Sequence, residues 1–588
     1  MTTDVFKKVD YTLDQLLNQI DLGTISLPDI QRPFVWKPSK VRDLFDSMYQ
    51  GFPIGNLLFW KNDTSASTKS IGVDIKQKAP DLLIVDGQQR LTSLFAVFTG
   101  RPVLFDDYVE RQIHIAFNPI TEVFEVTDAA IRNDPEFIPD ISSLLAGGDG
   151  EFAFVGRYLS KLTEVRHVDP EEQRRLAEAI SRLDQLRKYP LSALELDASL
   201  DEEKVAEVFV RVNSQGVTLK QADFILTLMS VFWEKGRVQL EEFCRAAAAP
   251  SKGAPSPFNH FIKPSPDQLL RVGIGVAFRR GRLKLAYNVL RGKDMESGAF
   301  SPERRTEQFE ELSRAQDQVV DLTSWHEYLK CLMAAGYVSG ATISSENALL
   351  YTYALYLIGR HQYSVDHASL RSAIARWFFM SALSGRYTNS PETRIEEDFA
   401  RLRNVETATD FVQVLADQVD AVLTNDFWSI QLPNELATSA SRGPSLFAFL
   451  AAQKLLRAPV LYSKLSVSDL LDPAIQSKKA PLERHHLFPR AFLRRVGVTS
   501  TRDINQIANF TLVEWTTNID ILDQPPSDYA PSYEVAVRAM KDGDNLLATM
   551  YELHALPSGW HEMPYAAFLE TRRDLMANVI RRGFDAIA

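Results

Sequence analysis

The sequence predicts an α+β protein of several domains, and the spacing of apolar residues along the chain is the main reason. Residues 1–225 alternate strand-like and helix-like segments, and residues 226–440 have an almost purely helical pattern. Residues 441–588 form a third unit behind a polar, linker-like stretch at 433–445. The length of 588 residues agrees with three or four domains, at roughly 150 residues per domain.

The elements of the first region follow from apolar periodicity. Short apolar runs at 25–27 and 56–60 are typical of strands, and the helix expected at 38–49 places Val41, Leu44, Phe45 and Met48 on one face. Pro38 suits the first turn of that helix. The same reasoning predicts, in order, a strand at 82–85, a helix at 88–98, a hairpin at 112–117 and 123–126, a helix at 171–187, a strand at 194–196 and a helix at 202–212.

The middle region is expected to consist of helices joined by loops. The stretch APSKGAPSP at 249–257 is rich in Pro, Gly and Ser, which mark a surface loop. The clearest helical patterns lie at 222–233, 308–323, 348–363, 370–384 and 409–423.

Charge, cysteine content and hydropathy exclude several classes of protein. A net charge of −11 argues against a protein that coats nucleic acid without specificity, because such binding depends on neutralising phosphates. Two cysteines, Cys244 and Cys331, provide neither a disulfide framework nor a Cys-based zinc site, and they suit a reducing cytoplasm. We find no signal-peptide pattern, and no apolar stretch reaches the roughly 20 residues of a membrane span. We therefore expect a cytoplasmic protein with no membrane association.

The most informative segment is ERHHLFP at 483–489, which is followed by Asn509 and Asn518. A strand that ends in two histidines aims their side chains in opposite directions, so one imidazole can face a metal ion while the other faces a water molecule. Neutral imidazole can act as a general base near pH 7, and an Asn carbonyl oxygen can bind Mg²⁺. The pattern therefore favours metal-assisted hydrolysis of a phosphodiester. The alternative is a pair of histidines that only cap a strand end or are solvated.

Arginines surround this segment. Residues 484–502 carry five of them and no acidic residue, which gives a local charge of +5 and leaves −16 for the rest of the chain. That is the charge a phosphate-tracking surface requires, and the candidate DNA contacts are Arg484, Arg490, Arg494 and Arg495, with Arg502 nearby. A second basic cluster comprises Arg572, Arg573, Arg581 and Arg582, for which a solvated helix face is the alternative explanation.

A second constellation lies at 81–95, DLLIVDGQQRLTSLF, where an apolar strand runs through an Asp-Gly turn into a helix. Backbone N–H groups at a helix start attract anions, and Gly87 permits close approach of the backbone. Arg90, one turn into the helix, can fork onto phosphate oxygens, Asp86 could hold Mg²⁺ or water, and Gln88 and Gln89 offer donors and acceptors. The chain has no GxxxxGK[ST] motif, which excludes a P-loop. The alternative is an ordinary buried turn with a surface arginine.

The C-terminal motifs resemble those of a nuclease family. HHLFPRAFL followed by NQIANFTLVEWTTNIDILDQPPSDY is similar to the ββα-metal (HNH, His-Me finger) domain of GmrD. The resemblance implies that His485 and Asn518 bind the metal, His486 is the general base and Asn509 holds the loop in shape. Two departures stand out. Related proteins often have Asp where His485 stands, and Gln524 stands where a Lys is common, so the phosphate contact that the Lys would make is not implied for this chain.

The N-terminal motifs resemble GmrS, whose fold is similar to ParB and sulfiredoxin. They are VDGQQRLTSL, the segment PDIQRPFVW at 28–36 with GFPIG at 51–55, and VFVRVNSQG at 208–216. The resemblance implies a nucleoside triphosphate site lined by Gln31, Arg32, Asp86, Gly87, Gln88, Gln89, Arg90 and Asn213. It also makes Phe34 a candidate for a modification-sensing pocket, with core packing as the alternative, and core packing is the role we expect for Trp36.

Together the motifs resemble a single-chain GmrSD-type (SspE/BrxU-like) type IV restriction enzyme. The resemblance implies an NTP-binding sensor domain at 1–225, a helical coupling region at 226–440 and an HNH nuclease domain at 441–588. Its expected cofactors are Mg²⁺ or another divalent metal and GTP or ATP. Its expected substrate is double-stranded phage DNA, either glycosylated or phosphorothioated, and double-strand cleavage by one such site would need a homodimer or two visits. Two alternatives are a nucleotide-gated DNA-binding protein with a silent nuclease and a toxin-like nuclease that does not read modification.

Overall fold

The computed structural model forms two compact units, Met1–Phe232 and Trp233–Ala588, which are described separately below. The protein is mixed α+β and mostly helical, as the sequence predicts. The expected boundary near residue 440 lies inside the second unit. The structure describes residues 5–26, 34, 36–61, 81–105, 109–147, 150–198, 200, 205, 208, 225–226, 229, 233–290, 292–293, 301–440, 442–471 and 482–587.

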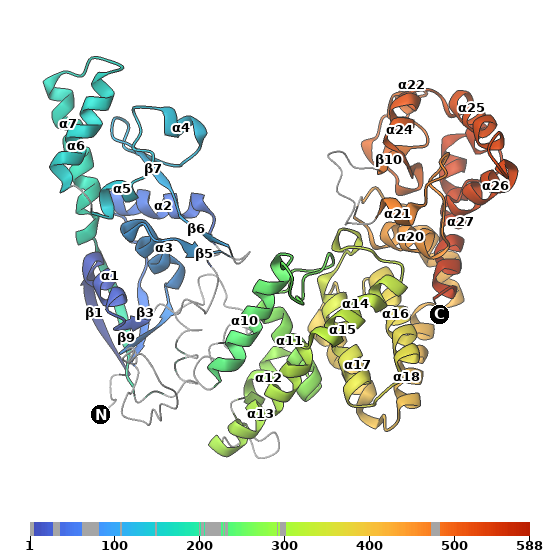
Figure 1. Cartoon of the computed structure of the whole chain (residues 1–588), viewed down its shortest axis with the longest axis horizontal. Helices are drawn as coiled ribbons and strands as arrows, with labels where there is room; N and C mark the ends of the chain where they lie inside the picture. Colours follow the sequence, from blue (N-terminus) through green and yellow to red (C-terminus); the bar gives the residue numbers. More distant parts are fainter. Residues whose placement is uncertain are drawn as a thin grey trace. The chain divides into compact units, whose positions relative to one another are not determined.

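The first unit is built on a mixed five-stranded sheet with strand order β1-β9-β3-β4-β2. β9 pairs antiparallel with β1 and parallel with β3, while β4 pairs antiparallel with β3 and parallel with β2. Figure 1 shows β1, β3 and β9 side by side although they are distant in sequence. The strand bounds are β1 Phe6–Thr12, β2 Ile25–Ser26, β3 Leu57–Lys61, β4 Leu82–Asp86 and β9 Pro190–Leu196.

Helices and two small hairpins complete this unit. The hairpins pair β5 with β6 and β7 with β8, and the second of these confirms the predicted hairpin. The bounds are α1 Leu13–Asp21, α2 Pro38–Tyr49, α3 Gln88–Thr99, β5 Val103–Leu104, β6 Glu110–Arg111, β7 Ile115–Asn118, β8 Val123–Val126, α4 Ala129–Asn133, α5 Ser142–Leu145, α6 Gly150–Thr163, α7 Pro170–Asp184 and the 3₁₀ turn η1 Gln185–Lys188.

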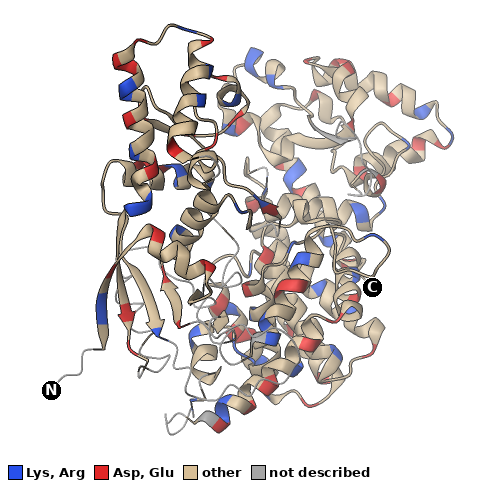
Figure 2. Ribbon diagram, turned by 60° about the vertical axis from the view of Figure 1, so that its left-hand side comes forward, with Lys and Arg blue, Asp and Glu red and all other residues tan. Residues whose placement is uncertain are grey.

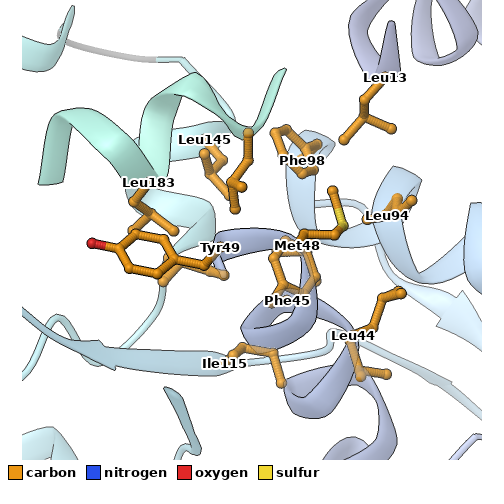
Figure 3. Close-up of a cluster of buried hydrophobic side chains, with 14 of the residues drawn as sticks. Leu13, Leu44, Phe45, Met48, Tyr49, Leu94, Phe98, Ile115, Leu145 and Leu183 are labelled. Carbon is orange, nitrogen blue, oxygen red and sulfur yellow. The ribbon is translucent and has the colours of Figure 1, made fainter. Parts of the chain in front are cut away.

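The core of the first unit forms where α2 and α3 meet the hairpin β7–β8. The apolar face of α2 is buried as its spacing predicts, with Phe45 fully covered and stacked on Phe98 of α3. Figure 3 shows this cluster, in which Ile115 and Leu183 also take part. Burial of one such side chain contributes about 1.5–3 kcal/mol, so the apolar periodicity is what fixes these helices in place.

The second unit begins with a helical region. Its bounds are α10 Glu234–Ala248, α11 Pro266–Phe278, α12 Leu283–Leu290, α13 Pro302–Val319, α14 Leu322–Ala334, α15 Glu346–His361, α16 His367–Leu383, α17 Pro391–Arg401, α18 Ala408–Val422, α19 Leu432–Glu435 and α20 Pro444–Leu455. Figure 2 shows acidic and basic residues interspersed along these ribbons.

One predicted helix of this region is wrong in its bounds. The pattern at 308–323 suggested one helix, but the chain ends α13 at Val319 and starts α14 at Leu322. Asp321 causes the break, because its side chain accepts a hydrogen bond from the Ser324 backbone at 2.7 Å and caps α14. Both helices have apolar faces, so periodicity alone runs across the junction. The helices expected at 202–212 and 222–233 lie mostly outside the described residues.

The second unit ends in a region of short elements around a two-stranded sheet. Its bounds are α21 Val467–Leu470, β10 Leu482–His486, α22 Arg490–Arg495, α23 Thr501–Ile504, the 3₁₀ turn η5 Ile507–Asn509, β11 Phe510–Glu514, α24 Trp515–Ile521, α25 Pro526–Arg538, α26 Gly543–Leu553, the 3₁₀ turn η6 Trp560–Glu562 and α27 Tyr565–Asp585. The long helix α27 packs against α20 and against η5. Within the described residues, no helix is long and apolar enough to span a bilayer.

Candidate functional site

The two histidines at 485 and 486 lie at the end of β10, in a strand–strand–helix unit. β10 and β11 pair antiparallel, with His485 opposite Thr511 and His486 opposite Phe510. α24 follows β11 without an intervening loop and places Asn518 one turn into the helix. The polar strand β10 and the apolar strand β11 together with α24 thus form a compact ββα unit, in which residues 33 apart in sequence meet.

His485 faces Asn518 in a buried position. Its Nδ1 atom lies 2.8 Å from Asn518 Oδ1, and the side chain is only 4% exposed. Burial lowers the pKa of His485 to about 4, so the imidazole is neutral at pH 7. The edge of its ring lies against Tyr529 of α25, with ring centroids 5.8 Å apart. The other ring nitrogen, Nε2, is buried and has no hydrogen-bond partner among the described residues.

The chemistry of the His485–Asn518 pair fits a divalent cation. A metal ligand must be unprotonated, and the lowered pKa of His485 meets that condition. Nδ1 of His485 and Oδ1 of Asn518, which lie 2.8 Å apart, would be the two atoms that hold the cation. An amide oxygen only accepts a hydrogen bond, so Nδ1 of His485 donates to Oδ1 of Asn518, and holding a cation here would require that proton to be released. Across the described residues, no three His, Cys, Asp or Glu side chains gather as a metal site.

His486 is held differently from its neighbour. Its Nε2 atom lies 3.0 Å from Oδ1 of Asn505, the residue that ends α23. The ring also packs on Phe510, with centroids 4.3 Å apart. Burial lowers the pKa of His486, and the nearby charge of Arg490 acts in the same direction. A neutral imidazole at pH 7 is the form that a general base requires.

Asn509 clamps the loop that follows the two histidines. Its side chain is fully buried, its Oδ1 accepts from the Phe488 backbone N–H at 2.9 Å, and its Nδ2 donates to Phe488 O and Ile504 O, each at 3.1 Å. The Leu487 backbone N–H donates to the Asn509 carbonyl at 2.8 Å. These bonds tie the end of β10 to the α23 turn, which is the geometry expected for a residue that shapes the loop.

The second basic cluster does not form one surface, because Arg572 is fully buried whereas Arg581 and Arg582 are exposed. Its guanidinium donates to Ala508 O at 2.5 Å and to His554 O at 3.1 and 3.3 Å, and no Asp or Glu pairs with it among the described residues. Burial lowers its pKa to about 9, which leaves it charged at pH 7. The prediction of a DNA-facing cluster is therefore wrong for Arg572. Arg581 and Arg582 bond Asn425 and Glu552 instead.

His554 belongs to the same buried network behind the sheet. Its Nε2 lies 2.8 Å from the carbonyl of Pro459, which can only accept, so Nε2 carries the proton. Its Nδ1 therefore accepts from the Thr511 hydroxyl at 2.7 Å, and Thr511 is the cross-strand partner of His485. Burial lowers the pKa of His554 to about 4.

This buried histidine should make the C-terminal region sensitive to acid. Its contribution to stability is complete above the unfolded pKa of about 6.5 and is lost as the pH falls toward 4, because protonation then favours the unfolded chain. Between pH 7.5 and 5.0 the expected loss is about 2 kcal/mol. Hydrogen exchange of the β10 and β11 amides measures this loss of stability. The stability of His554→Gln should depend less on pH than that of the wild type. If the stability of the wild type and of His554→Gln depended equally on pH, His554 would not be the source of the acid sensitivity.

The predicted phosphate-facing arginines lie around this unit. Arg490, Arg494 and Arg495 are exposed on α22, and Arg502 is exposed on α23. Arg495 shares an ion pair with Asp523 at 3.2 Å. The backbone of Arg484 lies in β10, but its side chain is outside the described part. Arg490 lies near enough to His486 to influence its pKa, so positive charge does lie beside this histidine.

In the first unit, the DGQQR turn joins β4 to α3 as predicted. Gly87 has φ of 93°, the left-handed region that glycine adopts without strain, and it is the N-cap of α3. Arg90 donates to Ile54 O at 2.6 Å and Asn56 O at 2.8 Å, and it contacts Asp86 at 3.3 Å. The guanidinium therefore holds the 51–56 loop against α3, and its direct contact with phosphate stays a prediction.

Gly87 is a place where a single methyl group should have a large effect. A Cβ atom there would lie 2.3 Å from Leu57 Cδ2, in addition to the strain of a positive φ. We expect Gly87→Ala to destabilise the first unit by about 2–4 kcal/mol. Gly23→Ala is the matched control, because Gly23 also has positive φ but an added Cβ would meet nothing within 4 Å. Thermal unfolding measures the stability of both variants. Equal losses of stability in Gly87→Ala and Gly23→Ala would contradict the predicted clash at Gly87.

Of the remaining predicted residues of the first unit, the structure describes Phe34 and Trp36. Phe34 is 2% exposed and packs edge-to-face on Phe105, with centroids 5.3 Å apart, so its ring lies in the core. Trp36 is partly exposed beneath the Lys40 ammonium, which lies 4.4 Å from the ring centroid. Gln31, Arg32 and Asn213 lie outside the described residues.

Sequence reasoning gave no role to Asn505, Tyr529 and His554 and placed Arg572 in a basic cluster, although all four contact the ββα unit or the turn that supports it. Asn505 and Tyr529 stand at the two ends of the quoted motif, whereas nothing in the local sequence of His554 or Arg572 sets them apart from surface polar residues. Adjacent histidines gave a signal because they are rare in this chain, whereas single Asn and Arg residues are common.

Comparison with known proteins supports the resemblance at the N-terminal end. Residues 13–230 match the family described as GmrSD restriction endonuclease, N-terminal domain. An uncharacterized protein of Methanocaldococcus jannaschii is 21% identical over 544 residues, which cover 86% of this chain and 84% of that protein. The aligned stretch is longer than the second unit, so the similarity extends into both units. The family match supports a GmrSD-type restriction enzyme domain in this chain, which implies a DNA substrate.

Proposed function

We propose that this protein is a DNA endonuclease of the type IV, modification-dependent restriction class that defends a bacterial or archaeal cell against phage. The GmrSD-type match over residues 13–230 supports the class. The meeting of His485, His486, Asn509 and Asn518 in one ββα unit supports a nuclease, because the four residues named for the HNH resemblance converge there from three separate elements. That convergence is the observation that carries the proposal.

In the proposed reaction, His486 acts as the general base. It takes a proton from a water molecule, the water oxygen attacks phosphorus, and the bond to the leaving oxygen breaks as that oxygen gains a proton. His485 and Asn518 would hold a divalent cation, which when bound supplies charge stabilisation for the phosphate and the leaving oxygen. Asn509 keeps the loop after β10 in place, and the exposed arginines of α22 contact the DNA backbone.

The first unit is proposed to bind and hydrolyse a nucleoside triphosphate and to control the nuclease. The α3 N-terminus behind Gly87 presents backbone N–H groups and a favourable dipole to an anion. Arg90 lies less than a turn further on and fixes the 51–56 loop beside it, so the site is built from loop and helix together. The acidic remainder of the chain, at −16 outside residues 484–502, suits an enzyme that binds DNA weakly until a second contact holds it.

Plasmid nicking by the full chain tests this function. We expect nicks in supercoiled DNA only when Mg²⁺ or Mn²⁺ is present, and we expect [α-³²P]GTP or ATP to bind the wild type and to bind Gln88→Ala more weakly. A chain that binds nucleotide and DNA but never nicks is the silent-nuclease alternative. Equal nicking of every DNA without regard to modification or nucleotide favours the toxin-like alternative.

A further inference from the structure

Asn505, the C-cap residue of α23, contacts the proposed base His486. Its Oδ1 atom lies 3.0 Å from Nε2 of His486, and although Asn505 is the first residue of the NQIANFTL stretch, the resemblance assigns it no role. An amide oxygen can only accept a hydrogen bond, so Nε2 carries the proton of the neutral imidazole. The lone pair is then on Nδ1, on the opposite side of the ring.

The turn that carries Asn505 is fixed from several sides. Asn509 Nδ2 donates to Ile504 O at 3.1 Å, and the Tyr565 hydroxyl of α27 donates to Asp503 O at 2.7 Å. Two residues beyond Asn505, the Ile507 backbone N–H donates to Thr438 O at 2.8 Å. The amide is therefore presented by a braced turn, and its hydrogen bond limits the rotation of the imidazole.

A face of the His486 imidazole is constrained by packing against Phe510. The Phe510 ring lies 4.3 Å from it, centroid to centroid, at an interplanar angle of 49°. Phe510 is also the cross-strand partner of His486, so this contact follows from the register of β10 and β11. With one ring nitrogen bonded to Asn505 and one face against Phe510, a single orientation of the side chain remains favourable.

We propose that Asn505 is a positioning residue for the nuclease reaction, which fixes the proton of His486 on Nε2 and aims the Nδ1 lone pair at the attacking water. The inference rests on the proposed nuclease function. A base in the wrong tautomer or orientation presents an N–H where the water needs an acceptor, so the orienting bond affects the rate of the chemical step. DNA binding depends on other groups and should be unchanged.

Two variants of Asn505 separate this role from a general effect on folding. Asn505→Leu keeps the volume but removes the acceptor, and Asn505→Asp keeps an acceptor at the same place. In single-turnover nicking at saturating DNA, we expect the Leu variant to be about 10- to 100-fold slower than wild type, and the Asp variant to recover most of that loss. Asn545→Leu is the matched control. Asn545 is an exposed residue of the same unit, and its side-chain amide donates a hydrogen bond to the nearby Asp542 rather than to the ββα unit.

A spectroscopic measurement makes the test independent of activity. Long-range ¹H–¹⁵N spectra of the full chain labelled with [¹⁵N]histidine report the tautomer of His486, assigned by its loss in His486→Ala. We expect the Nε2–H form in the wild type and the Asp variant and a mixture in the Leu variant. The inference is overturned if the wild type nicks and the Leu variant nicks at the same rate, or if both variants are slowed alike. A wild type that nicks no DNA overturns the proposed function itself.

Discussion

Replacement of His486 by alanine is expected to lower metal-dependent nicking by about 10²–10⁴-fold, the usual contribution of a general base. The expectation rests on its position at the end of β10, where the neighbouring His485 is turned toward Asn518 and His486 is not. Burial lowers the pKa of His486 and keeps it neutral at pH 7. No other histidine in the described part of the ββα unit is placed to replace it, because His485 is occupied by Asn518.

Single-turnover rates on supercoiled DNA measure this effect, with filter binding or anisotropy to show that DNA affinity is retained. His367→Ala is the matched control, because His367 lies on α16 and contacts Glu327 rather than the ββα unit. Nicking by His486→Ala at the wild-type rate would show that the base is assigned to the wrong residue.

The largest effect on stability is expected for Arg572→Ala, which should destabilise the C-terminal region by about 3–5 kcal/mol. The alanine would leave the carbonyls of Ala508 and His554 buried without their donors, and it would open a cavity where the guanidinium packed. Relief of the buried charge acts in the opposite direction, but the charge is already paired with carbonyl dipoles. Loss of this brace should also loosen the turn before Asn509 and slow nicking.

Arg582→Ala provides the control on the same helix. Arg582 is exposed and pairs with Glu552, and surface ion pairs of this kind contribute about 0–1 kcal/mol. Free energies of opening from hydrogen exchange of β10 and β11 amides compare the two variants within the full chain. A loss from Arg572→Ala no larger than that from Arg582→Ala would contradict the role of the buried guanidinium.

Local patterns predicted most of the secondary structure and the motifs but not the supporting contacts. The apolar face of α2, the strand–turn–helix around Gly87 and the strand that ends in two histidines each follow from spacing within about a dozen residues. Arg572 could not be placed, because its burial depends on α27 packing against η5, some 60 residues away in sequence. The Asn505–His486 bond likewise depends on a turn fixed by other elements.

The same limit applies to the aromatic residues near the QRP motif. Sequence reasoning left Phe34 between a sensing pocket and core packing and assigned Trp36 to core packing, and only the structure shows how far each ring is buried. Phe34 lies in the core against Phe105, whereas Trp36 retains an exposed face beneath Lys40.

Cleavage of matched phage DNA tests the central claim most directly. Genomic DNA from one phage, prepared with and without its base or backbone modification, is incubated with the full chain, Mg²⁺, and GTP, ATP or no nucleotide, beside His486→Ala. The account predicts that the wild type cleaves one of the two DNAs preferentially, that nucleotide changes the rate, and that His486→Ala cleaves neither. Equal cleavage of both DNAs with and without nucleotide, or cleavage by His486→Ala at the wild-type rate, would contradict it.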